Sequence, residues 1–111
     1  MRRVIIESPF KGDEKRSEEQ NVQYARACAH DCISRGEAPF ASHLFYTQEG
    51  ILNDLIPEER MMGIHAGQAW GVCADLIVVY IDHGISKGMQ YSIEHYGKIG
   101  IPIEERTLYK K

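Results

Sequence analysis

The chain has 111 residues, a formal net charge of −3 and 43% hydrophobic residues. This size fits one domain, and the composition argues against a disordered chain and against a surface that coats nucleic acid. No segment approaches the roughly 20 apolar residues of a membrane span, and no signal peptide is recognisable. The three cysteines form no disulfide framework. We therefore expect one cytoplasmic domain, residues 1–111, with no membrane or nucleic-acid partner.

The first predicted elements are a strand and a helix. Residues 3–7 contain an apolar run that fits a strand covered on both faces, and proline and glycine turn the chain between Ser8 and Gly12. Ser17-Glu-Glu-Gln20 matches a capping box, so a helix should begin there, and Gly36 is placed to end it. The apolar spacing predicts a buried stripe of Val22, Ala25, Ala29, Cys32 and Ile33.

The middle of the chain holds a second strand, a long connection and a second helix. A strand is predicted at residues 38–42, and the loop that follows, 43–56, has a length more typical of a functional lid than of spare chain. Pro57 opens a helix with two glutamates in its first turn. Glycines then recur at positions 63, 67 and 71, which predicts close approach to the sheet, a partner helix or a ligand.

The last third of the chain begins with the strongest strand signal. Residues 76–81 form an apolar run too short for a helix, and the polar turn 82–84 ends it. A helix is expected at 87–99 and a short strand at 101–104, before a polar tail of Lys110 and Lys111. A strand, a glycine-containing turn and a helix N-terminus together form a place where an anion can bind free backbone N–H groups.

Strands and helices therefore alternate along the chain. This order predicts an α/β three-layer fold, flavodoxin-like or Rossmann-like, in which helices cover both faces of a parallel sheet of about four strands in the order 2-1-3-4. Ligands of such sheets bind at the carboxyl ends of the strands, where the strand order reverses. The residues expected at that point are Ser8, Pro9, Phe10, Gly12, Ser42, His43, Tyr46, Asp82, His83, Gly84, Ser86 and Gly88.

Several short motifs support a family resemblance. They are Ser8-Pro-Phe-Lys-Gly12 followed by Asn21, Ala74-Asp75 before the apolar strand, Ser86-Lys-Gly88, and Gly100-Ile-Pro-Ile103. Together they resemble the nucleoside 2-deoxyribosyltransferase-like superfamily, which includes 2′-deoxynucleoside 5′-phosphate N-hydrolases and small phage proteins, over nearly the whole chain. The resemblance implies a flavodoxin-like fold, a nucleoside or nucleotide ligand and often a homodimer or higher homo-oligomer. It also implies that Ser86 and nearby amides hold a 5′-phosphate.

The chain departs from this superfamily at the residues that would carry the reaction. The nucleophilic glutamate of the superfamily falls at Ser92, and its supporting aspartate falls at Gly67. Glu94 lies two residues beyond Ser92, about 200° around the helix, so it does not simply replace the missing carboxylate. Glu59, beside the long loop, is a second candidate replacement. The candidate catalytic residues are therefore Glu59, Glu94 and Asp82. Of these, Asp82 would orient the sugar or base.

Several of these residues also have a structural interpretation. Ser86 could be only a helix cap. His43 and His83 could be acid–base groups or ordinary loop histidines. Tyr46 could stack on a base or pack the loop, and Trp70 fits either the core or a dimer interface.

No metal and no cofactor are expected. Cys28 and Cys32 share a helix face, but His30 points elsewhere and no second pair exists, so core packing explains them better than a metal site. The sequence contains no P-loop, dinucleotide-binding, nucleophile-elbow or zinc-protease motif, and no basic stripe for nucleic acid.

Two classes of function remain open at this stage. As an enzyme, the protein would cleave or exchange the N-glycosidic bond of a nucleoside or its monophosphate. As a binding protein, a sponge or a sensor, it would hold a nucleotide or a nucleotide-derived signal without turnover, which would explain the missing carboxylates. Base release from nucleotides would distinguish the two.

Overall fold

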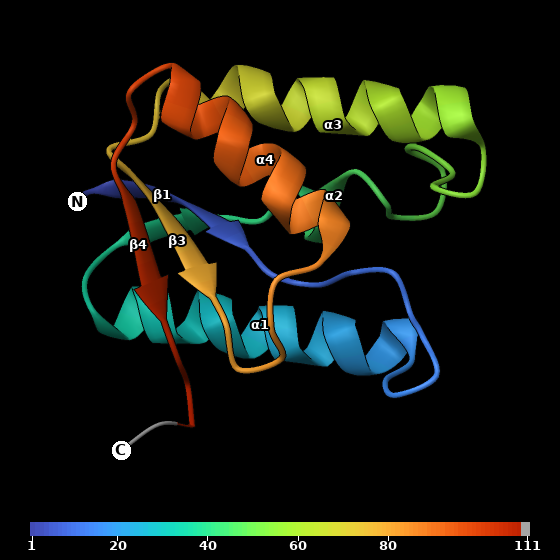
Figure 1. The fold of residues 1–111 in the computed structure, drawn as a ribbon, viewed down its shortest axis with the longest axis horizontal. Helices are drawn as coiled ribbons and strands as arrows, with labels where there is room; N and C mark the ends of the chain where they lie inside the picture. Colours follow the sequence, from blue (N-terminus) through green and yellow to red (C-terminus); the bar gives the residue numbers. More distant parts are fainter. Residues whose placement is uncertain (110–111) are drawn as a thin grey trace.

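A computed structural model describes residues 1–109; the predicted tail, Lys110 and Lys111, lies outside this range. Four parallel strands form one sheet in the order β2-β1-β3-β4, which confirms the predicted topology. The strands are β1 (Arg3–Glu7), β2 (Ala38–Phe40), β3 (Leu76–Tyr80) and β4 (Ile103–Arg106) (Figure 1).

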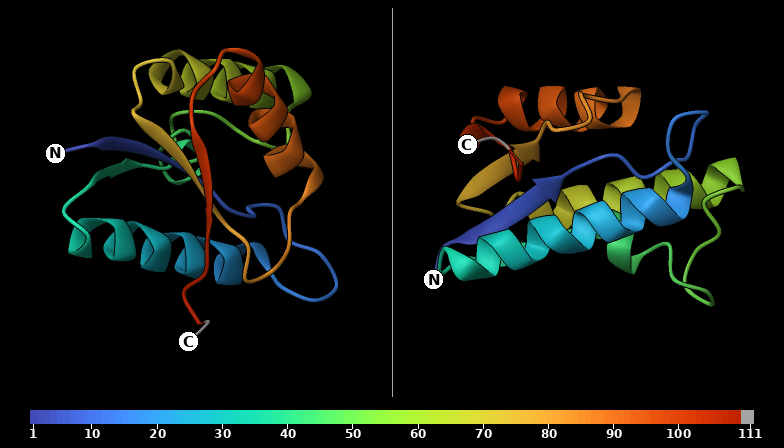
Figure 2. Two further views of the ribbon diagram at one scale, coloured as in Figure 1. Left: turned by 60° about the vertical axis from the view of Figure 1, so that its left-hand side comes forward. Right: turned by 90° about the horizontal axis from the view of Figure 1, so that it is seen from below.

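Helices cover both faces of the sheet. The helix α1 (Glu18–Ser34) lies on one face, whereas α3 (Pro57–Gly71) and α4 (Lys87–Lys98) lie on the other (Figures 1 and 2). A short helix, α2 (Ser42–Phe45), follows β2 and was not predicted. Within residues 1–109, no helix is both long enough and apolar enough to cross a membrane.

Strand β1 distributes its side chains between the two faces by the two-residue period of a strand. Val4 and Ile6 belong to the apolar core beneath α1. Ile5 belongs to the other core, together with Met89 and Tyr96 of α4. By the same alternation Glu7, the last residue of β1, lies on the α4 face. A carboxylate therefore ends an apolar strand at the carboxyl edge of the sheet.

The start of α1 agrees with its sequence signal, but its buried face does not fully agree. Ser17 caps the helix and Gln20 completes the capping box. The buried residues are Asn21, Tyr24, Ala25, Cys28 and Cys32. Ile33 is 59% exposed, so its place in the predicted stripe is wrong. The buried face is set one residue earlier because Asn21 turns inward, where its amide donates to the carbonyls of Phe10 and Lys11 at 3.2 and 3.1 Å.

Two strand boundaries also differ from the sequence prediction. The second strand ends at Phe40, and Ser42 begins α2 instead of extending the strand. The last strand begins at Ile103, two residues later than expected. Pro102 has no N–H and therefore cannot donate a hydrogen bond to the sheet. It only accepts one, through its carbonyl, from the Ile77 amide at 2.9 Å.

The recurring glycines of α3 allow its neighbours to approach closely. A Cβ atom at Gly67 would lie 2.8 Å from Cβ of Ser42 in α2, and one at Gly71 would overlap the ring of Tyr96 in α4. Both distances are too short for a real side chain, so the glycines face these two helices. Trp70, beside Gly71, is 62% exposed and therefore does not belong to the core of this chain.

Candidate functional site

A cavity of about 400 Å³ lies at the carboxyl end of β1. Its walls come from the end of β1 and the turn after it, from α2 and α3, and from one side of α4. This is the point between β1 and β3 where the strand order reverses, the usual ligand position in such folds. The volume is within the range of small-molecule sites.

The cavity collects eight of the residues proposed from sequence. Those that line it are Ser8, Phe10, Ser42, His43, Tyr46, Glu59, Ser86 and Gly88. Those that do not line it are Pro9, Gly12, Asp82, His83, Gly84 and Glu94. Ser92 and Gly67, the positions where superfamily carboxylates were expected, both line it. The structure therefore brings the first-strand turn and the start of α4 together, as predicted, but separates the turn after β3 from them.

Asp82 does not line the cavity; its carboxylate hydrogen-bonds to other parts of the fold. Its carboxylate accepts hydrogen bonds from the Tyr24 hydroxyl and from the Leu108 and Tyr109 amides, the latter two at 2.9 and 3.1 Å. Burial alone would raise the pKa of Asp82, but these hydrogen bonds hold it below the usual value. His83 packs against the Tyr24 ring, with centroids 4.4 Å apart. Asp82 thus joins the segment after β4 to α1, which corrects its expected role in the cleft.

The two proposed replacement carboxylates differ in position. Glu94 is exposed on the outer side of α4, where it accepts a hydrogen bond from Gln90 at 2.9 Å, so it is not a cavity residue. Glu59 does line the cavity, and its Oε1 accepts a hydrogen bond from the Asn53 amide at 2.6 Å. One oxygen of Glu59 is therefore used to hold the preceding loop.

Ser86 both caps α4 and lines the cavity. Its Oγ accepts a hydrogen bond from the Met89 amide at 3.2 Å and caps α4, and the same residue lines the cavity. Because a helix N-terminus carries free N–H groups and a partial positive charge, this wall favours an anion.

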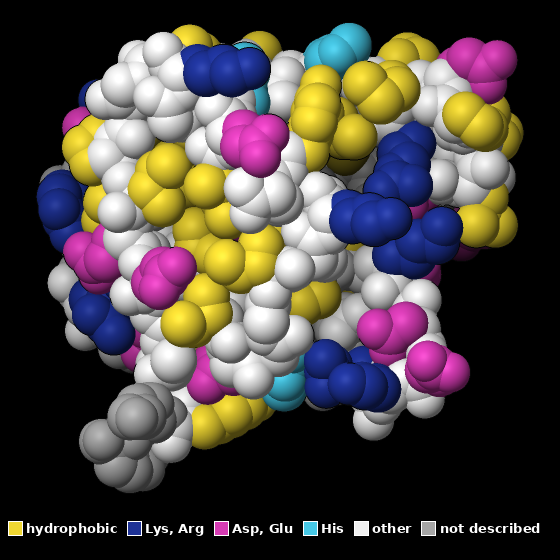
Figure 3. Space-filling view, in the orientation of Figure 1, with side chains coloured by type: hydrophobic (Ala, Val, Ile, Leu, Met, Phe, Trp, Pro, Cys, Tyr) yellow, Lys and Arg dark blue, Asp and Glu magenta, His cyan; other side chains and the backbone are white. Residues whose placement is uncertain are grey.

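Three cationic side chains add to this preference. Lys11, Arg60 and Lys87 line the cavity and are exposed, so they lie at its mouth. Figure 3 shows Lys and Arg side chains gathered beside a hollow between α3 and the start of α4. A ligand with a negatively charged group at one end fits this distribution.

His43 and Ser8 form a hydrogen-bonded pair inside the cavity. The Ser8 Oγ and His43 Nε2 are 2.8 Å apart. Burial lowers the pKa of His43 to about 4, so its ring is neutral at physiological pH. The edge of the imidazole approaches Phe10, with centroids 6.2 Å apart. This pair can hydrogen-bond a ligand but cannot supply a charged imidazolium near neutral pH.

Glu7 is among the cavity residues that were not expected from sequence. Burial raises the pKa of its carboxyl group to about 8, and Ser92 opposes that rise only in part. Among residues 1–109, no Lys, Arg or His side chain forms an ion pair with Glu7. The signal that could have found it is a carboxylate closing a strand that is otherwise buried and apolar.

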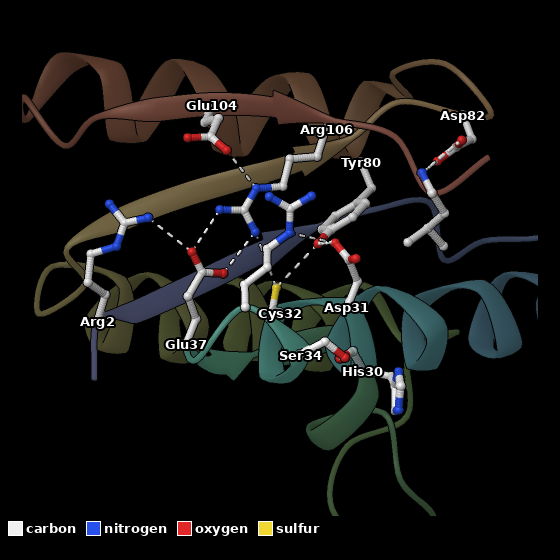
Figure 4. A network of polar contacts seen from close by, with 12 residues as sticks. Arg2, His30, Asp31, Cys32, Ser34, Glu37, Tyr80, Asp82, Glu104 and Arg106 are labelled. Atoms are coloured by element: carbon white, nitrogen blue, oxygen red, sulfur yellow. Dashed lines mark hydrogen bonds and ion pairs between the residues drawn. The ribbon is translucent and has the colours of Figure 1, made fainter. Parts of the chain in front are cut away.

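A second buried carboxylate, Glu37, lies on the other face of the sheet. It accepts two hydrogen bonds from Arg106, both at 2.8 Å, and one from Arg2 at 3.0 Å (Figure 4). Arg106 also donates to Glu104 at 2.7 Å. The bonds from Arg106, more than any other cause, lower the pKa of Glu37 to about 2. Glu37 therefore stays ionised with its charge balanced.

The described residues offer no evident metal site. Within residues 1–109, no cluster of three or more His, Cys, Asp or Glu side chains could hold a metal ion. Cys28 and Cys32 are buried in the core beneath α1, and the Cys32 sulfur lies 3.4 Å from the Tyr80 hydroxyl.

The fold is similar to that of a solved structure, and the sequence matches one family. A solved structure of a 2-deoxyribosyltransferase from Bacillus psychrosaccharolyticus superposes with a TM-score of 0.64 at 18% sequence identity, covering 95% of this chain and 72% of that one. The likeness shows a shared Rossmann-like α/β fold. The chain itself belongs to the family described as Domain of unknown function (DUF7768), whose model matches residues 2–106. A search of curated proteins found no match.

Proposed function

We propose that the protein binds a nucleoside or nucleotide in the cavity and cleaves or exchanges its N-glycosidic bond. The observation that carries this proposal is the Glu7 carboxyl group, which is partly buried, lines the cavity and has no ion-pair partner among residues 1–109. A carboxyl group with a strongly shifted pKa in a cleft is typical of acid–base chemistry. The fold shared with a 2-deoxyribosyltransferase supports N-glycosidic bonds as the target.

The cavity walls suit the parts of a nucleotide. Phe10 and Tyr46 offer aromatic surfaces for a base. Ser86, Gly88 and the cations at the mouth offer donors and positive charge for a phosphate. The cavity thus has a place for an apolar ring and a separate place for an anion, as a nucleoside monophosphate requires.

The alternative is a protein that binds a nucleotide without turnover. The observation that favours it is the absence of carboxylates at Ser92 and Gly67, the two positions where the superfamily pattern expects them. Glu7 favours the enzyme, because a pure binding site for an anion gains nothing from a buried, unpaired carboxyl group.

The proposal includes self-association, as the family resemblance implies. Trp70 and Phe45 are 62% and 51% exposed. Large aromatic side chains are typical of the buried centre of an interface. A homodimer or higher homo-oligomer would remove these two from water.

The test is to incubate the protein with nucleosides and nucleoside monophosphates, in ribose and 2′-deoxyribose forms. Base release is measured by chromatography and binding by thermal shift. We expect stabilisation together with base release, and weaker binding of monophosphates in Lys87→Ala because a phosphate contact is lost. Stabilisation without release would favour the binding protein, and no stabilisation by any compound would contradict both functions.

A further inference from the structure

Three side chains that line the cavity lie near one another. Glu7 comes from the end of β1, and Ser92 and Tyr96 lie on successive turns of α4. Ser92 is close enough to lower the pKa of Glu7, although no direct hydrogen bond of ordinary length joins them in the part of the chain that the structure describes. Burial and then the Glu7 carboxylate raise the pKa of Tyr96. The carboxyl group therefore faces the side of α4 that carries Ser92.

We propose that Glu7 is the catalytic carboxyl group of this cavity, donating a proton to the departing base, and that Ser92 positions it. This inference rests on the proposed function. It assigns the acid to strand β1, whereas the candidates expected from sequence, Glu59, Glu94 and Asp82, lie in α3, in α4 and after β3. Glu7 and Ser92 are 85 positions apart in the sequence numbering, from 7 to 92, so local spacing along α4 could not have revealed the pair.

The surroundings of Glu7 favour the protonated form at neutral pH. Burial disfavours a carboxylate, and no ion pair offsets that cost among residues 1–109. Tyr96 of α4, whose pKa burial raises, stays neutral and offers no positive charge. The other ionisable groups that line the cavity are Lys11, His43, Tyr46, Asp54, Glu59, Arg60, Lys87 and Tyr91. His43 is neutral, and the three cations are exposed at the mouth.

The reaction step balances with water as the only co-reactant. The Glu7 proton transfers to a nitrogen of the base while the bond between that base and the sugar C1′ breaks, and the bonding electrons stay with the base. Water then adds to C1′, and its proton returns to the Glu7 carboxylate. The products are the free base and the sugar or sugar phosphate, and the carboxyl group is regenerated.

Glu7→Gln tests the proton donor, since glutamine has nearly the same shape and no acidic proton. Base release should fall by about 10²- to 10⁴-fold, the usual contribution of a general acid. Glu94→Gln is the matched control, because Glu94 is exposed on the outer side of α4; it should keep the wild-type rate. Thermal unfolding of each variant confirms folding, and Glu7→Asp, which retains an acid at greater distance, should keep part of the rate.

The pH profile separates proton donation from other roles. A donor with a pKa near 8 gives a rate that falls above that pH. Ser92→Ala should move this fall to higher pH, because Ser92 lowers the pKa of Glu7, whereas a purely structural effect would lower the rate equally at every pH.

Three other outcomes would each contradict a different part of the proposal. Base release that survives in Glu7→Gln would overturn the assignment of Glu7 and leave the proposed function standing. A rate that rises through pH 8 would show that the carboxylate, not the acid, is the active form, and would overturn proton donation. No base release by the wild type from any compound would overturn the proposed function and this inference with it.

Discussion

Glu37 is buried and Glu7 is partly buried on opposite faces of the same sheet, and their partners differ. Glu37 meets the guanidinium groups of Arg106 and Arg2, and its pKa falls to about 2. Glu7 lies near the Ser92 hydroxyl and forms no ion pair within residues 1–109, and its pKa rises to about 8. The difference shows that the partner, more than burial itself, decides the charge of a buried carboxyl group.

The two environments also have different consequences for stability and function. A paired, hydrogen-bonded carboxylate such as Glu37 holds β4 against the end of α1, and it is costly to disturb. An unpaired carboxyl group such as Glu7 costs stability whenever it ionises. A fold retains such a group more readily when the cleft uses it. The comparison predicts that breaking the first site unfolds the protein, whereas neutralising the second stabilises it and removes activity.

The largest expected effect comes from Arg106→Met. The variant removes both hydrogen bonds that Arg106 donates to Glu37 and leaves a buried carboxylate with only the half-exposed Arg2. Breaking a buried pair in this way lowers the free energy of unfolding by about 3–5 kcal/mol. Chemical denaturation at neutral pH measures it.

Arg2→Met is the matched control for that variant. Arg2 contacts the same carboxylate, but its side chain is 57% exposed. An exposed pair contributes at most about 1 kcal/mol. Equal losses from Arg2→Met and Arg106→Met would contradict a central role for the Arg106–Glu37 pair.

A smaller effect, which depends on pH, is expected at Glu7. Its pKa is about 8 in the folded chain and about 4.5, the ordinary value, in the unfolded chain, so between about pH 5 and 8 the unfolded chain releases this proton first. Stability is therefore lost as pH rises through this window, by up to about 1.4 kcal/mol per pH unit. Glu7→Gln removes this loss, so the free energy of unfolding of the variant should increase relative to that of the wild type as pH rises.

This measurement has to be a difference between wild type and variant. His43, whose pKa falls to about 4, contributes with the opposite sign: stability is lost as pH falls below 6.5. Both proteins contain His43, so the difference cancels it. Parallel stability curves from pH 5 to 8 would mean that Glu7 is not buried as an acid.

The sequence was sufficient for the fold because each strand carries its own signal. The apolar runs of β1 and β3, the capping box at Ser17 and the Pro57 helix start are local patterns, and alternation fixes the topology. The candidate site could be predicted only in part. Ser8, His43 and Ser86 follow from the rule that ligands bind at strand ends, and all three line the cavity.

The remaining features depend on contacts between distant segments. Asp82 has the residue type and position of a cleft residue. Its carboxylate instead accepts hydrogen bonds from the amides of Leu108 and Tyr109, 26 and 27 positions later. The sequence predicts Glu7 only as the end of a strand, because its face becomes known only when α4 is placed over it. Such pairings cannot be obtained from periodicity within one element.

The most direct test is a titration of the individual carboxyl groups by NMR of carbon-labelled glutamate side chains. Glu7 and Glu37 are assigned by the signals that disappear in Glu7→Gln and Glu37→Gln. We expect Glu7 to titrate near pH 8, while Glu37 stays ionised down to about pH 2. A Glu7 signal that titrates near its ordinary value of 4.5 would contradict the role of Glu7 as an acid at neutral pH.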